Sequence, residues 1–208
     1  MSLPYTLLLR LEGPMQSWGY RSRFDYRDTA LEPTRSGVIG LICAAMGIAR
    51  GEDISRFDAI RMGVRVDKEG RPERDYHTAL DVIKADGSGK DTVVSYRDYL
   101  ADAIFTVGLE SDDKDLLEEI AKALCNPTWT LFLGRKAFPL AVPPIGFADC
   151  PKPGTLYQHL LSEHSNKRVV LETPDGEITQ HDWPLCFGKR QFKPRSIQTC
   201  FDAKGDPK

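Results

Sequence analysis

The stretch EPTRSGVIGLICAAMGIAR, residues 32–50, contains the helix around which the rest of the chain can be organised. Apolar residues recur at helical spacing, which predicts a helix over 36–49, and Thr34 or Ser36 can cap its start. A second face of this helix carries small residues spaced 3, 4 and 3 apart, namely Gly37, Gly40, Ala44 and Gly47. Each glycine costs about 1 kcal/mol of helix propensity, so something must approach this face closely. Tight packing on a sheet and the direct approach of a ligand both explain it.

Arg35 stands at the threshold of this helix, where a cation faces the positive end of the helix dipole. The placement costs a few tenths to about 1 kcal/mol unless an anion lies between the cation and the helix. Free backbone N–H groups at a helix start also bind anions. A solvated guanidinium is one interpretation. The interpretation that we favour is a phosphate group held by the PTRSG turn.

The elements on either side of this helix follow a known order. The predicted elements are a strand at 5–13, the helix at 36–49, a strand at 59–67, two extended arms across 75–100, a strand at 103–110, a helix at 113–127 and a strand at 128–141. This is the ferredoxin-like order with a hairpin inserted between its second and third strands. We therefore predict an α+β fold with a ferredoxin-like domain over 1–144, its hairpin at about 70–100, and a small C-terminal α/β appendage over 145–208.

The composition is that of an ordinary soluble globular protein, with 41% hydrophobic and 28% charged residues. No apolar run approaches the roughly 20 residues of a membrane span. The N-terminal strand has no basic region before it and no cleavage pattern, so we expect a cytoplasmic protein. The five cysteines form no CxxC pair, and the four histidines do not pair with them at ligand spacing. We therefore expect no disulfide framework, no metal site and no cofactor.

The net charge of −2 excludes a globally basic nucleic-acid binder, but cations are concentrated locally. The segment WGYRSRFDYR, residues 18–27, interleaves four aromatic residues with three arginines. Aromatic faces stack on bases and guanidinium groups bind phosphates, so this mixture is typical of single-stranded nucleic-acid binding. A loop packed by its own aromatic residues is the alternative. Further basic clusters are the turn LGRKAF at 133–138 and the set Lys189, Arg190, Lys193 and Arg195.

The segment RDYHT, residues 74–78, contains residue types that an RNA-cutting enzyme would need. Tyr76 or His77, together with a lysine such as Lys84 or Lys90, could cleave RNA without a metal ion. Successive strand residues point to opposite faces, however, so Tyr76 and His77 cannot share a face without a bulge. A contact or packing role for His77 is the interpretation that we favour. No paired-carboxylate metal pattern, HExxH motif or P-loop is visible.

Five motifs in a single order carry a resemblance to a known family. They are LRLEGPMQSWG, PTRSGVIGLICAAMGI, RDYHTAL, YRDYLADAIFTVGL and LGRKAFPLA, and they run from Leu9 to about Ala141. In these motifs the chain resembles the CasD subunits of type I-E Cascade, the CRISPR surveillance complex. The resemblance covers two-thirds of the chain.

The resemblance implies a non-catalytic RNA-binding subunit of a ribonucleoprotein complex for antiviral defence. Its fold would be a ferredoxin-like RAMP domain with a thumb-like hairpin. CasD subunits hold the 5′ handle of the CRISPR RNA (crRNA), cap the backbone filament and touch the large subunit. The thumb lies near the handle–spacer junction, where the complex meets target DNA; no membrane partner is implied. Two alternatives stay open: a metal-free endoribonuclease that processes precursor crRNA, as in a related subtype, and a plain protein scaffold.

The resemblance and the basic segments together predict the residues that contact the RNA. These are Gln16, Trp18 and Gly19 in the first motif, Arg23 and Arg27 in the aromatic-arginine loop, Thr34, Arg35 and Ser36 in the PTRSG turn, Arg74, Tyr76 and His77 at the start of the thumb, and Gly134, Arg135 and Lys136 in the GRK turn.

Overall fold

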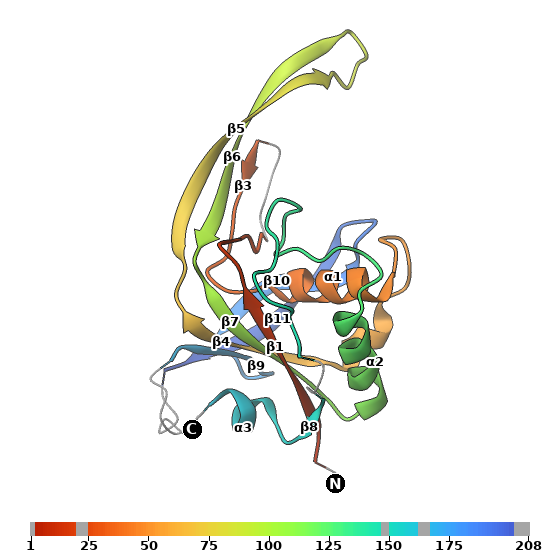
Figure 1. The fold of residues 1–208 in the computed structure, drawn as a ribbon, viewed down its shortest axis with the longest axis vertical. Helices are drawn as coiled ribbons and strands as arrows, with labels where there is room; N and C mark the ends of the chain where they lie inside the picture. The colour runs from red at the N-terminus through yellow and green to blue at the C-terminus, as the bar shows by residue number, and fades with distance from the viewer. Residues whose placement is uncertain (1–2, 20–24, 147–149, 162–166, 202–208) are drawn as a thin grey trace.

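A seven-stranded sheet forms the centre of the molecule (Figure 1). The computed structural model describes residues 3–19, 25–146, 150–161 and 167–201. Strands β1 (Tyr5–Glu12), β7 (Ile104–Ser111) and β4 (Arg61–Lys68) lie side by side and antiparallel within the order β10-β11-β9-β4-β7-β1-β8. The short helix η1 (Ser55–Ala59) precedes β4. The predicted α+β class is therefore confirmed.

Helices α1 (Arg35–Met46) and α2 (Lys114–Cys125) cover one face of this sheet. Alternate residues of β1 point toward them, because Leu7, Leu9 and Leu11 belong to the same buried cluster as the apolar residues of both helices. Thr34 caps α1, since its side chain accepts a hydrogen bond from the Gly37 N–H at 3.3 Å. The packing of β1 against the two helices and the Thr34 cap both follow from the sequence pattern.

The opposite face of the sheet is covered by the short helix α3 (Leu156–Leu160). Two glycines in the central strands make room for this helix. A Cβ atom at Gly108 would lie 2.6 Å from Leu156, and one at Gly63 would lie 2.6 Å from Leu160. The helix can therefore pack close to the sheet only because both strands carry glycine at this level.

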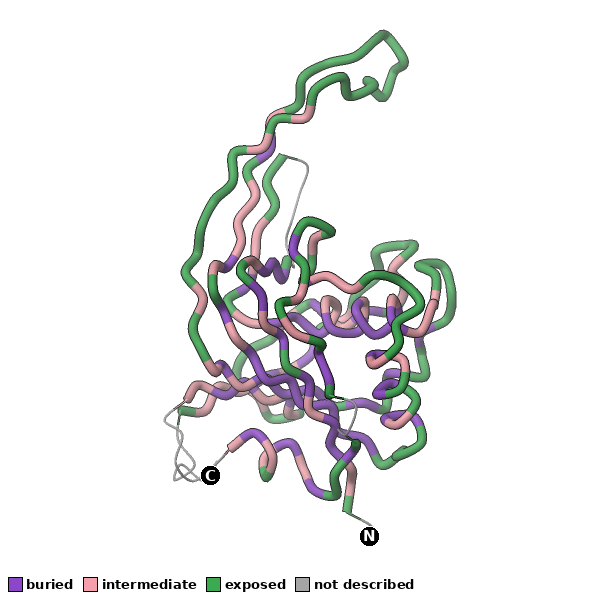
Figure 2. Tube along the Cα trace, viewed as in Figure 1, coloured by how far each residue is buried: buried purple, intermediate pink, exposed green. Residues whose placement is uncertain are grey.

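A long hairpin rises from the sheet (Figure 1). Its strands are β5 (Arg71–Ile83) and β6 (Lys90–Ala101), and most of its length is exposed (Figure 2). The turn between them closes with a hydrogen bond of 2.9 Å from the Lys84 N–H to the Gly89 carbonyl. At its base, β2 (Met15–Gln16) and β3 (Tyr26–Arg27) pair with β6. The hairpin lies between β4 and β7 and overlaps the range 70–100 in which the sequence predicts one.

The strand predicted at 128–141 is wrong. In this segment the structure has one isolated bridge, between Phe132 and Pro139. The N–H groups of Thr128 and Trp129 instead donate to carbonyls at the end of α1, at 2.8 and 3.2 Å. The position beside β1 is taken by β8 (Lys152–Pro153). The sequence therefore predicts a strand at the start of this segment, whereas its backbone N–H groups form hydrogen bonds with the end of α1.

The segment after residue 145, predicted to be an appendage, extends the main sheet. Strand β9 (Val169–Glu172) pairs with β4, and β11 (Gln191–Cys200) and β10 (Ile178–Cys186) follow it. The free edge of β4 is thus extended by three strands from the C-terminal part of the chain.

Within the described ranges, no helix has the length and apolar character that crossing a membrane requires.

Two glycines of α1 should respond in opposite ways to the addition of a methyl group. A Cβ atom at Gly37 would lie 2.7 Å from the buried ring of Trp18, whereas one at Gly40 would lie 3.7 Å from Phe187, in ordinary contact. Overpacking costs about 1–3 kcal/mol, and alanine gains up to about 1 kcal/mol of helix propensity. We expect Gly37→Ala to lower the free energy of unfolding in urea and Gly40→Ala to raise it. Equal stabilisation by both would contradict close packing against Trp18.

Candidate nucleic-acid interface

The first predicted motif places two of its residues inside the protein. The Gln16 side chain donates to the Ala103 carbonyl at 2.8 Å and accepts a hydrogen bond from the Trp18 indole N–H at 3.2 Å. Gln16 has no exposed surface and Trp18 is 1% exposed. These two side chains therefore hold the base of the hairpin to the core and do not reach a ligand as they stand. Gly19 is exposed, and Arg23 lies outside the described residues.

The PTRSG turn is also internal. Arg35 is 1% exposed, and its guanidinium donates to Glu172 at 3.1 Å and to the Phe57 carbonyl at 2.9 Å. Its backbone N–H donates to the Asp182 carboxylate at 2.7 Å. Thr34 is buried as the helix cap, and Ser36 is half-buried. The anion expected at this helix start is therefore a carboxylate of the same chain, and the predicted Arg35–phosphate contact conflicts with this geometry.

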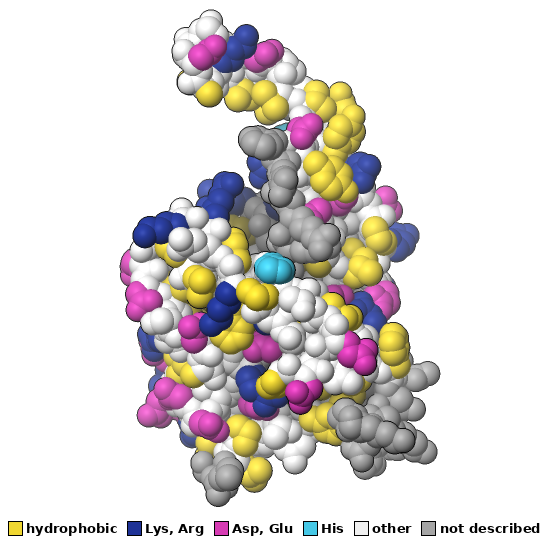
Figure 3. Space-filling model, turned by 180° about the vertical axis from the view of Figure 1, so that it is seen from behind, with side chains coloured by type: hydrophobic (Ala, Val, Ile, Leu, Met, Phe, Trp, Pro, Cys, Tyr) yellow, Lys and Arg dark blue, Asp and Glu magenta, His cyan; other side chains and the backbone are white. Residues whose placement is uncertain are grey.

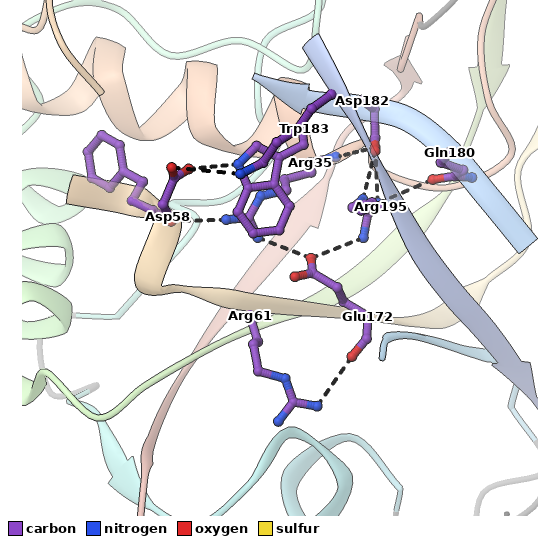
Figure 4. A network of polar contacts seen from close by, with 10 residues as sticks. Arg35, Asp58, Arg61, Glu172, Gln180, Asp182, Trp183 and Arg195 are labelled. Carbon is purple, nitrogen blue, oxygen red and sulfur yellow. Dashed lines mark hydrogen bonds and ion pairs between the residues drawn. The ribbon is translucent and has the colours of Figure 1, made fainter. Parts of the chain in front are cut away.

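A second arginine, Arg195, completes this buried network, and Figure 4 shows it with Arg35, Glu172 and Asp182. Arg195 donates to Asp182 at 2.7 and 3.0 Å and lies 3.4 Å from Glu172. The ring of Trp183 packs 3.6 Å from the Arg35 guanidinium. Burial lowers the pKa of Arg35, while the neighbouring Glu172 opposes this shift. The network ties the start of α1 to β9, β10 and β11.

The GRK turn lies at the surface beside the hairpin. Gly134 has a φ of +86°, and a Cβ atom there would lie 1.7 Å from the Ser17 carbonyl oxygen. Glycine is thus required for the turn to approach Ser17. The half-buried Arg135 donates to the backbone carbonyls of Asp98 at 2.8 Å and Arg27 at 3.2 Å, and Lys136 is exposed. Gly134 therefore positions the turn, while the two cations after it form part of the surface.

Three arginines gather at the foot of the hairpin. Arg27 on β3 lies directly opposite Arg97 on β6, in a parallel register. Burial lowers the pKa of Arg135, the charges of Arg97 and Arg27 lower it further, and the carboxylates of Asp98 and Asp75 oppose the shift. Like charges placed opposite one another are destabilising. We call Arg27, Arg97 and Arg135 the foot cluster. Figure 3 shows lysine and arginine side chains gathered beside the hairpin on one face.

Arg74 lies beside the foot cluster but is already paired. Its guanidinium donates to both carboxylate oxygens of Asp98, at 2.6 and 3.2 Å, and to the Tyr26 hydroxyl at 3.1 Å. These bonds hold the pKa of Asp98 below its usual value, chiefly through Arg74. The Tyr26 hydroxyl also donates to the Asp98 carboxylate at 2.5 Å, and this hydrogen bond raises the pKa of Tyr26. Arg74 therefore anchors β3 to the hairpin.

Tyr76 and His77 lie further along the hairpin. Tyr76 is 61% exposed and packs against Tyr96 with ring centroids 5.6 Å apart, while His77 lies 3.7 Å from Asp75. The lysines required by the nuclease alternative are at the hairpin tip, where Lys90 pairs with Ile83, six residues beyond His77. At about 3.3 Å per residue, that separation is roughly 20 Å. The convergence that this alternative requires is absent among these residues.

Comparison with known proteins identifies the family. A family model described as CRISPR-associated protein (Cas_Cas5) matches residues 6–198. The chain belongs to this Cas5 family. It is 38% identical over 154 residues to the CRISPR system Cascade subunit CasD of Escherichia coli (strain K12), a match that spans 66% of this chain and 68% of the relative. The resemblance to CasD subunits is thereby confirmed.

Two solved structures share the fold over nearly the whole length of this Cas5 chain. One, described as a CRISPR RNA-guided surveillance complex, has a TM-score of 0.79 at 32% identity and covers 94% of this chain and 89% of that chain. The other, described as the crystal structure of a Cas protein, has a TM-score of 0.75 at 37% identity and covers 94% and 93%. The C-terminal strands therefore lie within the shared fold, although the sequence motifs stop near residue 141.

The predicted RNA contacts did not include three residues of this Cas5 surface, namely Tyr26, Arg97 and Asp98. Their placement depends on the two-residue pairing of β3 with β6, which leaves no periodicity in the sequence. A separate pocket of about 420 Å³ lies away from the hairpin and is lined in part by Leu8, Arg10, Thr106 and Pro144. Among the described residues, its lining contains no histidine, aspartate or glutamate.

Replacing Arg35 should lower the free energy of unfolding more than replacing an exposed arginine does. Arg35→Met leaves two buried carboxylates with Arg195 as their remaining arginine partner, and breaking a buried pair costs about 3–5 kcal/mol. Arg56 pairs with Glu119 at the surface, where a pair contributes about 0–1 kcal/mol. Urea unfolding of Arg35→Met and the control Arg56→Met measures both losses. A loss for Arg35→Met as small as the control's would refute the structural role of the network.

Proposed function

We propose that this protein is a non-catalytic crRNA-binding subunit of a type I-E Cascade complex and that it holds the 5′ handle at the foot of the hairpin. The main support is the foot cluster, in which Arg27, Arg97 and Arg135 lie close together although their charges repel one another. A phosphate group between guanidinium groups converts that repulsion into attraction and accepts charge-assisted hydrogen bonds. The similarity to a Cascade subunit and to a surveillance-complex structure supports the same assignment.

The sheet order supports the finer description of the fold. Strands β1, β7 and β4 with crossover helices α1 and α2 correspond to three strands and two helices of a ferredoxin-like RAMP domain, and the hairpin corresponds to its thumb. The fourth strand would be the short β8. In this proposal the subunit acts in the cytoplasm, caps the backbone filament, contacts the large subunit and meets target DNA through the assembled complex near the handle–spacer junction.

Exposed residues near the foot cluster complete the proposed interface. Lys136 and Gly19 are exposed, and the exposed rings of Tyr76 and Tyr96 offer faces on which bases can stack. Thr34, Arg35 and Ser36 act behind this surface, because they fix α1. Arg74 acts through Asp98 and Tyr26 on the position of β3.

The double variant Arg27→Ala/Arg97→Ala should weaken binding of a fluorescent handle RNA and reduce its salt dependence. Each lost phosphate contact lowers the slope of log K against log salt by about 0.7 for a single strand, so two lost contacts lower it by about 1.4. Fluorescence anisotropy across a salt titration measures this slope. Lys122→Ala, at an exposed position of α2, is the matched control. An unchanged slope in the double variant would rule out the foot cluster as the handle site.

The same proteins distinguish the subunit from a nuclease. A repeat-hairpin RNA incubated with the wild-type chain in EDTA should remain intact. Cleavage that disappears in His77→Ala would overturn the non-catalytic assignment, because it would show metal-free chemistry at the hairpin.

A further inference from the structure

The turn between β10 and β11 carries a group of exposed cations that the proposed handle site does not use. Lys189 and Arg190 lie in this turn and are exposed. The Gly188 N–H donates to the Arg50 carbonyl at 2.7 Å, which places the exposed Arg50 beside the turn. Three cations from two distant parts of the chain are thus held together by a backbone contact.

These cations lack the acidic partners that neutralise most other arginines in this protein. Within the described ranges, no carboxylate forms an ion pair with Arg50, Lys189 or Arg190. The neighbouring Lys193, in contrast, lies 3.8 Å from Asp58 and 4.2 Å from the Trp183 ring centroid. Unpaired surface cations in a cluster favour an anionic ligand with several charges.

An aromatic pair accompanies the cations. The rings of Phe187 and Phe192 meet edge to face with centroids 6.5 Å apart. Phe187 is half-buried near Gly40 of α1, whereas Phe192 is 40% exposed. One ring is therefore anchored on the helix while the other presents surface to solvent. An exposed aromatic face among unpaired cations is the combination that single-stranded nucleic acids require.

The turn also lies where an RNA strand leaving the foot cluster could reach it. Figure 1 shows the β10–β11 turn and the GRK turn on the side of the sheet from which the hairpin rises, with α1 running beneath them. Both turns are tied to α1. Phe187, beside the β10–β11 turn, lies near Gly40 of the helix, and the chain leading into the GRK turn donates from Thr128 and Trp129 to carbonyls at the helix end.

We propose that Arg50, Lys189, Arg190 and Phe192 form a second contact for single-stranded RNA, along a path that begins at the foot cluster. The cations would bind phosphates and Phe192 would stack on a base. This inference rests on the proposed function, because the foot cluster supplies the first contact. The RNA-binding surface would then extend from the foot cluster to the turn between β10 and β11.

The test compares three RNAs on the full chain by fluorescence anisotropy. One is the handle alone, and the other two are the handle extended by unstructured uridines at its 5′ end or at its 3′ end. We expect Lys189→Glu/Arg190→Glu to weaken binding of an extended RNA at least tenfold and to lower its salt slope by about 1.4, with a smaller effect on the handle alone. Phe192→Leu should weaken binding of the extended RNA at every salt concentration without changing the slope.

Lys122→Glu on α2 is the matched charge-reversal control, and urea unfolding checks that each variant is folded. Wild-type affinity and slope of the turn variant for both extended RNAs would overturn the second contact. Loss of binding to duplex DNA of the same length, with RNA binding intact, would also overturn it as an RNA site. If Arg27→Ala/Arg97→Ala weakens binding while the turn variant does not, the second contact fails alone. If the foot variant binds normally, the handle site itself fails.

Discussion

The structure depends on a buried group of four charges between α1 and the C-terminal strands. Arg35 and Arg195 are each within reach of Glu172, and Asp182 accepts hydrogen bonds from Arg195 and from the first backbone N–H of α1. Such a group adds little stability over an apolar core of equal volume, but losing one member leaves an unpaired buried charge. The network therefore sets where β9, β10 and β11 sit against α1, and it makes the C-terminal segment part of the main fold.

This arrangement separates two uses of arginine. Arg35 and Arg195 are buried and neutralised by carboxylates of the same chain, so a ligand does not reach them. Arg27, Arg97 and Arg135 are brought together at the foot of the hairpin, where Arg97 donates to a hydroxyl and Arg135 donates to two backbone carbonyls. A polyanion would be stabilised by the second kind of site and excluded from the first. The proposed nucleic-acid surface consequently lies beside the hairpin, and the start of α1 supports it from within.

Much of the fold up to residue 125 could be predicted from the sequence, because alternation, helical spacing and turn residues are local signals. The strands near 5–13, 59–67 and 103–110, both main helices and the hairpin follow from them. The segment 128–141 could not be predicted, since its backbone donors bond to the end of α1. The extension of the sheet by β9 could not be predicted either, because it depends on which strand edge is free. In the candidate site, Gln16, Trp18 and Gly134 were predicted to contact RNA, but Gln16 and Trp18 are buried in the core and Gly134 allows the GRK turn to approach Ser17.

Arg35 shows where the two kinds of information divide. The sequence alone determined that a helix begins near residue 36, capped by Thr34 or Ser36, and that a cation at this threshold is unfavourable unless it is solvated or an anion lies near it, because helix capping and the helix dipole act locally. Only the tertiary structure decided that the anion is Asp182, 147 residues later in the chain, with Glu172 beside it. The physical reason is that a helix start attracts any negative charge, whereas the identity of that charge depends on which distant strand the folded sheet places against it.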